Sequence, residues 1–303
     1  MKQTFLTIAA LLVPLFVFSQ QHFHRALPPG NYSGICRIAA DTFAVVDDKA
    51  PTDGFYLFRL AADTLRGRIT EAQNLGYRSS GQPNRDMEGV CYRPSTRTLF
   101  VSGESDNAVY EYTLDGQRTG RSLAMPTVFR HAAKNLGLES LTYDTSSHRF
   151  FVTTERPLPG DSLLRIQTFG DDLQPQCQYL YKPDAPLSPS HHHGVSELCA
   201  TGDGRLLVLE RQLRVPRRGL GASARIRIYV VEPTPTLSSY GSLLRKTLVT
   251  QFTTRLTLTS RKYANYEGLC CLSPRHLLLV ADSQNRYRHV LNDWFLLLTP
   301  GKY

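Results

Sequence analysis

The sequence lacks any hydrophobic run long enough to cross a bilayer as a helix. Its one extended apolar stretch, Phe5 to Phe18, is shorter than the roughly 20 residues that such a helix needs. Lys2 precedes this stretch, and Ser19 supplies a small residue before a cut at Gln20, which is typical of a secretory signal peptide. We predict a signal peptide over residues 1–19 and a secreted or periplasmic chain, with an uncleaved anchor as the alternative. Residues 20–303 are expected to form a single domain without a membrane span.

The sequence also lacks two hydrolase signatures. It contains no Gly-x-Ser-x-Gly segment, which forms the nucleophile turn of many serine esterases. It contains no Arg-His-Gly segment of the kind found in phosphatases that use a catalytic histidine. Any hydrolytic activity would therefore depend on other groups.

The six cysteines do not follow the spacing of a disulfide framework, although an exported chain with six could form three bridges. Cys36, Cys91 and Cys270 each lie three residues after the start of a similar motif, so they occupy equivalent places. Cys270 and Cys271 are adjacent, and in a strand their side chains point to opposite faces. We expect small buried residues with mostly free thiols.

Acidic residues are outnumbered by basic ones, which gives a formal net charge of +9. The basic residues are scattered, with one cluster between Arg214 and Arg227. Because export makes a nucleic-acid partner improbable, we expect an anionic small-molecule substrate such as a phosphate ester, or an acidic polymer. A solvated basic surface is the alternative, and the chain is expected to act as a monomer.

Helical periodicity is missing as well, and short apolar strands repeat in its place. Five similar segments begin at intervals of 55, 51, 58 and 70 residues, at Ser33, Glu88, Glu139, Glu197 and Glu267. Each contains a strand, a turn, a second strand and an acidic residue, and two further strands complete most units. This pattern predicts an all-β fold, a β-propeller of five four-stranded blades. A sixth blade inside the longest interval and a set of unrelated packed hairpins are the alternatives.

The last unit has only three predicted strands and ends at Trp294 to Thr299. The N-terminal segment "HFHRALPP" precedes the first unit and is available as a fourth strand. We predict that an N-terminal strand completes the last blade, because this closure removes two exposed sheet edges.

The repeat places acidic residues where the blades meet. The first strand of each blade lines the channel of a propeller, so one position per blade points to a common axis. Two like charges 4 Å apart repel by roughly 4 kcal/mol at an effective dielectric of about 20. A ring of acids therefore needs a bound cation, Arg or Lys partners, or protonation of some members. The residues at this position are Glu88, Glu139, Glu197 and Glu267, with Ser33 in the first unit.

The register of the fourth unit is open at this position. The next acid follows Glu197 sooner than it follows the other ring glutamates. If Cys199 is matched to Cys91, Ser196 becomes the equivalent of Glu88. A shift of one residue would turn Glu197 to the other face of its strand.

A second acid closes the second strand of each unit. Two of these acids are followed directly by arginines, Arg156 and Arg211. Alternating carboxylates and guanidinium groups can hold a cation and an anionic ligand together. Alternatively, each acid is a structural partner of a neighbouring arginine or turn amide. The set contains Glu104, Glu155, Glu210 and Asp282, with Asp47 or Asp48 in the first unit.

Hard oxygen ligands and an extracellular setting favour calcium as the cation. A zinc site would rest on "HHHGVSE", His191 to Glu197, but adjacent histidines lack the spacing of such a site. We interpret that run as a loop before a strand, from which His193 could reach a channel mouth. The predicted calcium ligands are Glu88, Glu104, Glu139, Glu197, Glu267 and Asp282.

These motifs resemble the phytase-like family, also described as "esterase-like activity of phytase". The resemblance implies an exported propeller that hydrolyses esters or phosphoesters with calcium. It runs through nearly the whole mature chain and rests on "DMEGVCYRPSTRTLFVSGES", "NLGLESLTYDTSSHRFFVTTERP", "GVSELCATGDGRLLVLER", "NYEGLCCLSPRHLLLVADSQN" and, more weakly, "SGICRIAADTFAVVDDK".

Two functions remain open at this point. The first is a calcium-dependent hydrolase in which a metal-activated water attacks and an arginine stabilises the developing charge. The second is a non-catalytic propeller of the cell envelope that keeps a structural ion and binds a ligand or protein. The catalytic residues predicted for the first are Glu139, Glu155, Arg156, Glu210 and Arg211.

Overall fold

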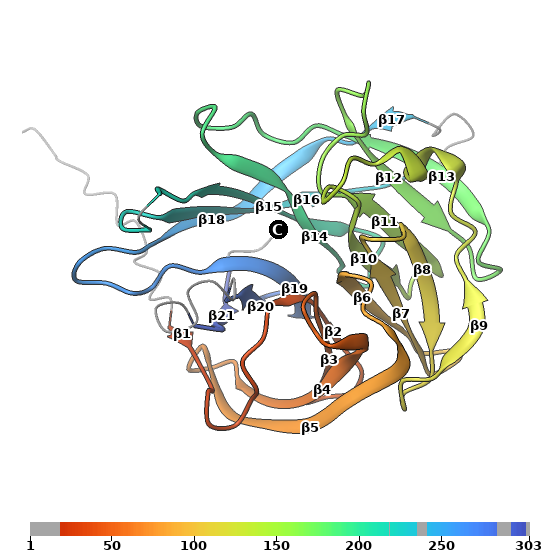
Figure 1. Cartoon of the computed structure of the whole chain (residues 1–303). Helices are drawn as coiled ribbons and strands as arrows, with labels where there is room; N and C mark the ends of the chain where they lie inside the picture. The colour runs from red at the N-terminus through yellow and green to blue at the C-terminus, as the bar shows by residue number, and fades with distance from the viewer. Residues whose placement is uncertain (1–18, 218, 235–240, 284–291, 301–303) are drawn as a thin grey trace, which may run out of the picture.

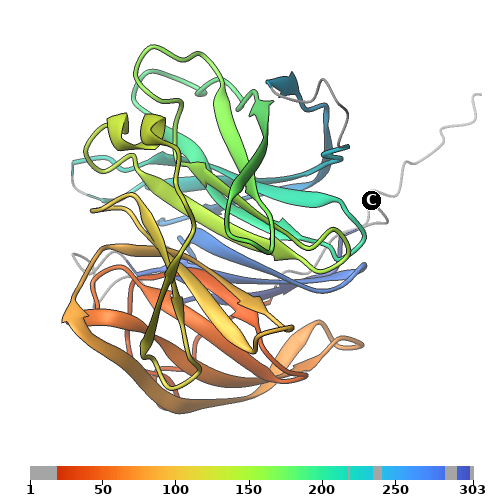
Figure 2. The same ribbon diagram turned by 90° about the vertical axis from the view of Figure 1, so that its right-hand side faces the viewer.

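The computed structural model of the protein describes residues 19–217, 219–234, 241–283 and 292–300. The predicted signal peptide lies outside these residues, apart from Ser19. Five antiparallel sheets stand around a common axis, and the chain passes from each sheet to the next (Figures 1 and 2). The predicted five-bladed β-propeller is therefore confirmed.

The blades follow the order of the chain. Blades 1 and 2 are built from β2 (Tyr32–Arg37), β3 (Thr42–Asp47), β4 (Thr52–Asp63) and β5 (Arg68–Pro83), then β6 (Met87–Arg93), β7 (Thr98–Gly103), β8 (Ala108–Tyr112) and β9 (Arg118–Ser122). Blades 3 and 4 are built from β10 (Leu138–Asp144), β11 (Arg149–Thr154), β12 (Leu164–Phe169) and β13 (Pro175–Tyr181), then β14 (His192–Ala200), β15 (Leu206–Arg214), β16 (Ser223–Val231) and β18 (Lys246–Arg255). Blade 5 contains β19 (Asn265–Ser273), β20 (His276–Asp282), β21 (Phe295–Leu298) and β1 (Gln20–Gln21).

The described part of the chain contains one short 3-10 helix, η1 (Thr127–His131), and no helix long and apolar enough to cross a membrane. β9 ends at Ser122, and Pro126 lacks the N–H that a ladder hydrogen bond would require.

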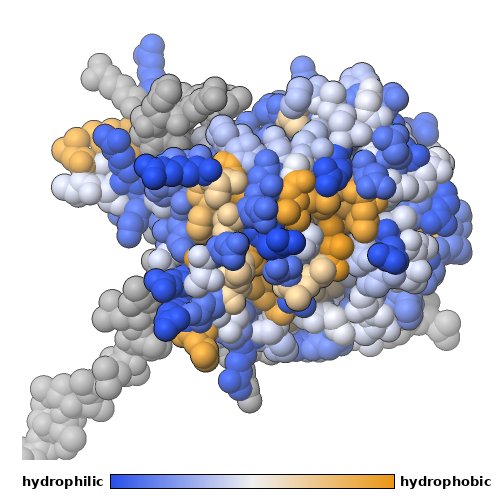
Figure 3. Space-filling model, turned by 90° about the horizontal axis from the view of Figure 1, so that it is seen from below, coloured by the Kyte–Doolittle hydropathy of each residue, from blue (hydrophilic) through white to orange (hydrophobic). Residues whose placement is uncertain are grey.

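The hydrophobic core is divided among the blade interfaces. Alternate residues of each strand point to the two faces of its sheet, so each blade packs against both neighbours. Five apolar clusters result, each drawn mainly from two adjacent blades. A fully buried Leu or Phe contributes about 1.5–3 kcal/mol, so these clusters hold the ring together. Hydrophilic residues cover much of the outer face seen in Figure 3.

The N-terminal segment closes the ring as predicted. β1 pairs antiparallel with β21, which matches Gln20 to Leu296 and Gln21 to Phe295. The closing strand lies directly before the "HFHRALPP" segment, not within it. The Gln21 side chain also exchanges two hydrogen bonds with the backbone of Ile69 in blade 1, at 2.7 and 2.8 Å. The latch therefore ties the last blade to the first.

The longest repeat interval contains no sixth blade within the described residues. Blade 4 has long strands, and the connection between β16 and β18 contains β17 (Ser242–Leu243). β17 pairs parallel with β13 and adds a fifth strand to the sheet of blade 3. β17 therefore attaches the connection of blade 4 to the edge of blade 3.

Each inner strand has an irregularity near its start. The register slips at this point in β2, β6, β10, β14 and β19, which is the mark of a β-bulge. The bulge turns one residue out of the regular alternation toward the channel. This residue is Glu88 in blade 2, Glu139 in blade 3 and Glu267 in blade 5, whereas in blade 4 the slip leaves Ser196 unpaired and matches Glu197 to Leu209.

Candidate functional site at the acidic end of the channel

Two of the four predicted ring glutamates, Glu139 and Glu267, meet around one guanidinium group. Arg211, from β15, donates to Glu139 Oε1 at 2.9 Å and forms a short hydrogen bond with Glu267. It also donates to Asn265 Oδ1 at 3.0 Å and lies 3.7 Å from Glu155 Oε1. Of the three ways to neutralise the ring, an arginine partner is therefore present.

The cluster is buried, which shifts the proton affinities of its members. Burial raises the pKa of Glu267 to about 7 although Arg211 opposes the shift, and burial likewise raises the pKa of Glu139 above its usual range. Burial alone would lower the pKa of Arg211, but Glu267, Glu139 and Glu155 raise it. Arg211 therefore keeps its charge, while burial favours the protonated forms of Glu139 and Glu267.

Glu88 has no ion pair with a described residue, although its charge acts on Arg211. Its side chain is 9% exposed, and no hydrogen bond or ion pair joins it to another described residue. Burial raises the pKa of its carboxyl well above the usual range, and the charges of Glu139 and Asp48 raise it further. A buried carboxylate in this position needs either a proton or a cation from outside the chain.

The second acid set contributes the outer part of the site. Glu104 accepts a hydrogen bond from the Gly137 backbone N–H at 3.1 Å, and burial raises its pKa. In the first unit Asp48, rather than Asp47, faces Glu88; it pairs with Lys49 at 2.7 Å, while its Oδ1 atom is buried without a hydrogen bond.

Asp282 completes this outer part. Its Oδ2 atom accepts a hydrogen bond from Asn265 Nδ2 at 3.5 Å, and the same amide donates to Glu267 at 2.7 Å. Asp282 is thus joined to the ring through Asn265.

Two predicted acids lie elsewhere. Glu210 accepts hydrogen bonds from Tyr181 at 2.6 Å and Lys246 at 2.5 Å, between blades 3 and 4. Glu197 projects away from the acidic cluster, among residues at the other end of the channel. Neither is brought together with Arg211.

Arg156 has a different environment from Arg211. Its Nε atom donates to the backbone oxygen of His193 at 2.9 Å, and no ion pair joins it to an acid of the described chain. Of the two predicted arginines, Arg156 is therefore the one whose charge is not paired with an acid in the part of the chain that the structure describes.

One polar residue of the site, Asn265, is not among the residues predicted from the sequence. Asn265 lies two residues before Glu267, as Asp86 lies two before Glu88 and Asn31 two before Ser33. The signal was present as "NYSG", "DMEG" and "NYEG" at the starts of three inner strands. Asn265 links Glu267, Arg211 and Asp282, so this position supplies polar partners for the ring.

The family model described as "Phytase-like: Esterase-like activity of phytase" matches residues 28–284. The chain belongs to the phytase-like family. The match extends from the segment before β2 to the residues that follow β20, so it includes the whole acidic site of this phytase-like propeller. No curated protein matches the chain.

Solved structures similar to the phytase-like propeller have varied activities. The catalytic domain of Coprinopsis cinerea GH62 α-L-arabinofuranosidase is 14% identical, over 94% of this chain and 98% of that one, with a TM-score of 0.49. A streptogramin B lyase is 11% identical, over 94% and 98%, with a TM-score of 0.43. A chain of a nidogen/laminin complex is 13% identical, over 85% and 74%, with a TM-score of 0.43. Structural similarity at this level of sequence identity gives no information on the activity of this chain.

The residues fit calcium in chemistry but do not form a complete ligand set as they lie. Among the described residues no three His, Cys, Asp or Glu side chains are close enough together to hold a metal ion. The available donors are hard carboxylate oxygens: Asp48 Oδ1 is buried without a hydrogen bond, and the Glu88 side chain, 9% exposed, has no hydrogen bond to a described residue. In the phytase-like propeller these two groups are the ones that a cation would satisfy.

Proposed function

We propose that this phytase-like propeller hydrolyses a phosphate ester or carboxylic ester at the acidic end of its channel, with calcium as its cofactor. The unpaired Glu88 carboxyl supports the proposal. It is buried among acids, and a cation between it and Asp48 would remove a repulsion of several kcal/mol. An isolated propeller has no structural need for such a group.

The chain's own residues divide the remaining tasks. Arg211 fixes Glu139 and Glu267 in place and stays charged. Glu88, with Asp48, would hold the cation, because neither carboxyl has a full set of partners among the described residues. Arg156, which no acid engages among the described residues, would bind the anionic part of a phosphate ester. Bound calcium would polarise an ester oxygen and lower the pKa of a bound water.

Thermal unfolding and turnover should be measured on the same protein, with millimolar calcium and with a chelator. The substrates are p-nitrophenyl phosphate, phytate and a short-chain p-nitrophenyl ester. We expect calcium to stabilise the wild type and to be required for turnover of at least one substrate. A ligand at 100 times its Kd stabilises by about 2.7 kcal/mol. Turnover that persists in chelator would contradict the cofactor, and no turnover in either condition would contradict the hydrolase.

Glu88→Gln tests whether the Glu88 carboxyl binds the cation, because the substitution keeps the shape of the side chain and removes its charge. We expect it to abolish both the calcium shift and the turnover while the fold is retained. Glu71→Gln, at an exposed site on β5, is the matched control and should leave both unchanged. An undiminished calcium shift in Glu88→Gln would contradict the assignment of this group.

The ion pairs of Arg211 favour a second candidate function, that of a non-catalytic binding propeller of the cell envelope. Its guanidinium already partners Glu139 and Glu267, as it would in a purely structural network. Stabilisation by calcium with no turnover of any of the three substrates would select this function.

A further inference from the structure

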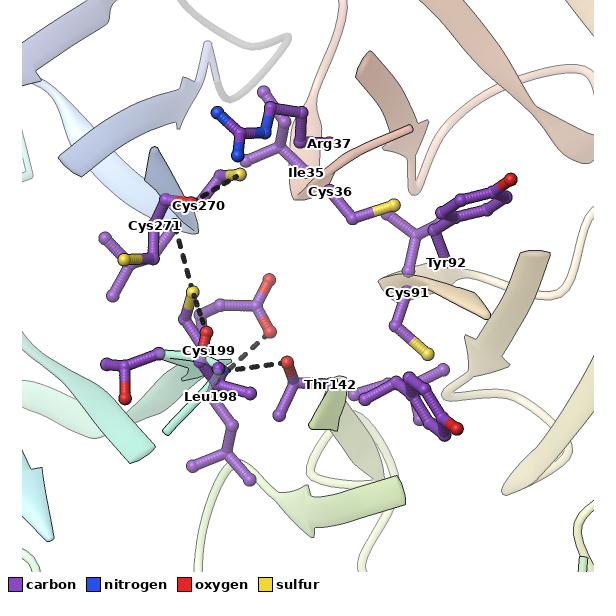
Figure 4. A pocket seen from close by; sticks show the side chains of 18 of the residues that line it. Ile35, Cys36, Arg37, Cys91, Tyr92, Thr142, Leu198, Cys199, Cys270 and Cys271 are labelled. Carbon is purple, nitrogen blue, oxygen red and sulfur yellow. Dashed lines mark hydrogen bonds between the residues drawn. The ribbon is translucent and has the colours of Figure 1, made fainter. Parts of the chain in front are cut away.

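A cavity of about 230 Å³ opens at the end of the channel opposite the acidic site. The first strand of every blade contributes an equivalent residue to its wall (Figure 4). Exposed turn residues such as Pro94, Thr145 and Gly202 also line it, so the cavity communicates with solvent. The equivalent residues, which define the thiol cavity, are Cys36, Cys91, Thr142, Cys199 and Cys270.

The thiols of this cavity are free and neutral. All six cysteines of the chain lack a disulfide, as the sequence predicted for most of them. Burial raises the pKa of each of the four cavity thiols above its usual range. A protonated thiol behaves as a small polarizable apolar group, so the wall is suited to hydrocarbon rather than to nucleophilic chemistry.

Glu197 is the exception in this wall. The equivalent positions in blades 1, 2 and 5 are glycines, and a Cβ on Gly89 would lie 2.6 Å from the backbone nitrogen of Leu141. A Cβ on Gly34 would collide with the carbonyl oxygen of Glu88. Blade 4 thus accommodates a long acidic side chain where three other blades have no space for a methyl group.

The Glu197 carboxyl is buried without a cation. The residue is 1% exposed and lines the thiol cavity. Its partners are backbone N–H groups, that of Leu198 at 3.1 Å and that of Leu141. Its charge adds to the effect of burial, which raises the pKa of the four cavity thiols.

The basic residue of the lining is engaged elsewhere. Arg37 donates to the backbone oxygen of Leu272 at 3.0 Å, and no ion pair joins Glu197 to a described residue. A buried carboxylate costs several kcal/mol unless a positive charge compensates it. Burial raises the pKa of the Glu197 carboxyl well above its usual range, so a cation that enters this apolar cavity would favour the charged form of the carboxyl.

We propose that the thiol cavity binds a small organic cation, a compact primary ammonium whose head pairs with Glu197 and whose hydrocarbon body packs on the thiols. Three features select this class. The cavity volume admits only a small molecule, Thr142 is a polar residue of the wall, and Tyr92 and Tyr143 are aromatic residues of the lining. No three potential metal ligands converge among the described residues, so charge pairing, rather than coordination, would hold the guest.

The test is a titration of the full chain with butylammonium and cyclohexylammonium, followed by calorimetry and thermal unfolding. Butanol and cyclohexanol are neutral controls of similar shape. We expect saturable binding of the ammonium ions, and at least tenfold weaker binding of the alcohols. Equal affinity for an ammonium ion and its alcohol, or no saturable binding by either cation, would overturn the proposal. Stabilisation by Zn²⁺ without stabilisation by the ammonium ions would overturn it in favour of a metal site.

Glu197→Gln keeps the shape of the side chain and should weaken ammonium binding at least tenfold. Cys36→Leu is a second, independent variant, which serves as the test if Glu197→Gln does not fold. It leaves the charge of Glu197 in place but fills part of the cavity, so it should abolish ammonium binding. Glu88→Gln, at the opposite end of the channel, should leave ammonium binding unchanged. Retention of full affinity in Cys36→Leu would show that the ligand lies outside the cavity.

Discussion

The two ends of the channel are built by the same five strands but have opposite chemistry. At the acidic end, the bulge residues Glu139 and Glu267 are paired with a charged Arg211. At the thiol end, a few residues further along each strand, one carboxyl has only backbone N–H partners. A single repeat can therefore present two different sites, because a bulge turns one residue of each strand while the regular alternation resumes after it.

Removing Arg211 should have the largest effect on stability. The acidic end would then contain buried carboxyl groups without a cation, as the thiol end does. Arg211→Met would leave Glu139, Glu155 and Glu267 without a cation in a buried space. Loss of one partner of a buried ion pair costs about 3–5 kcal/mol. Urea unfolding at neutral pH measures the loss. Arg66→Met is the control, because that arginine is 71% exposed and its single ion pair is worth little.

The pH dependence of stability should be the next largest effect. Burial raises the pKa of Glu267 to about 7, above the usual value near 4.5, so the folded chain binds this proton more tightly than the unfolded chain. The stability is therefore highest below the unfolded value and falls as the pH rises toward 7, by at most about 3 kcal/mol from this group. Urea unfolding between these pH values gives the slope.

Glu267→Gln should flatten that slope, whereas Glu71→Gln should not. A wild-type stability that rises across this window, with no change in Glu267→Gln, would mean that Arg211 keeps the carboxyl ionised. In that case the acidic end would be a set of full ion pairs.

Replacing a glycine of an inner strand by alanine should have a smaller effect on stability. Gly89→Ala would place a Cβ 2.6 Å from the backbone nitrogen of Leu141 in the next blade. Such overpacking costs about 1–3 kcal/mol. Ser140→Ala, at the equivalent position of blade 3, is the control, because its hydroxyl is buried without a hydrogen bond and its loss should be nearly neutral. Equal costs would contradict the view that only blades 3 and 4 have space for a side chain here.

The features of the fold that depend on the repeat period and on residue spacing could be predicted from the sequence. The five blades, the terminal latch and the positions of Glu88, Glu139 and Glu267 follow from a repeat of about 50 residues, which also fixes what faces the channel. The partners across blades do not follow from it. Glu210 bonds to Tyr181 and Lys246, which come from other strands, and nothing in the spacing predicts that meeting.

The fourth blade shows the limit most clearly. Both Ser196 and Glu197 were available for the bulge, and a difference of one residue decides which end of the channel receives the acid. The register is set by the pairing of Val195 with Glu210 and of Glu197 with Leu209, across strands. Only three-dimensional contacts settle a choice of this kind.

The smallest expected effect is at the thiol end. Cys36 is half-buried and lines a cavity that already exists, so Cys36→Ala enlarges a space instead of opening a new one. We expect a loss below about 1 kcal/mol, against about 2–5 kcal/mol for Ile35→Ala, whose side chain is packed in the core. Urea unfolding of the two variants makes the comparison. A large cost for Cys36→Ala would mean that the thiol is a packing element, and the neutral end of the channel would then resemble the rest of the core.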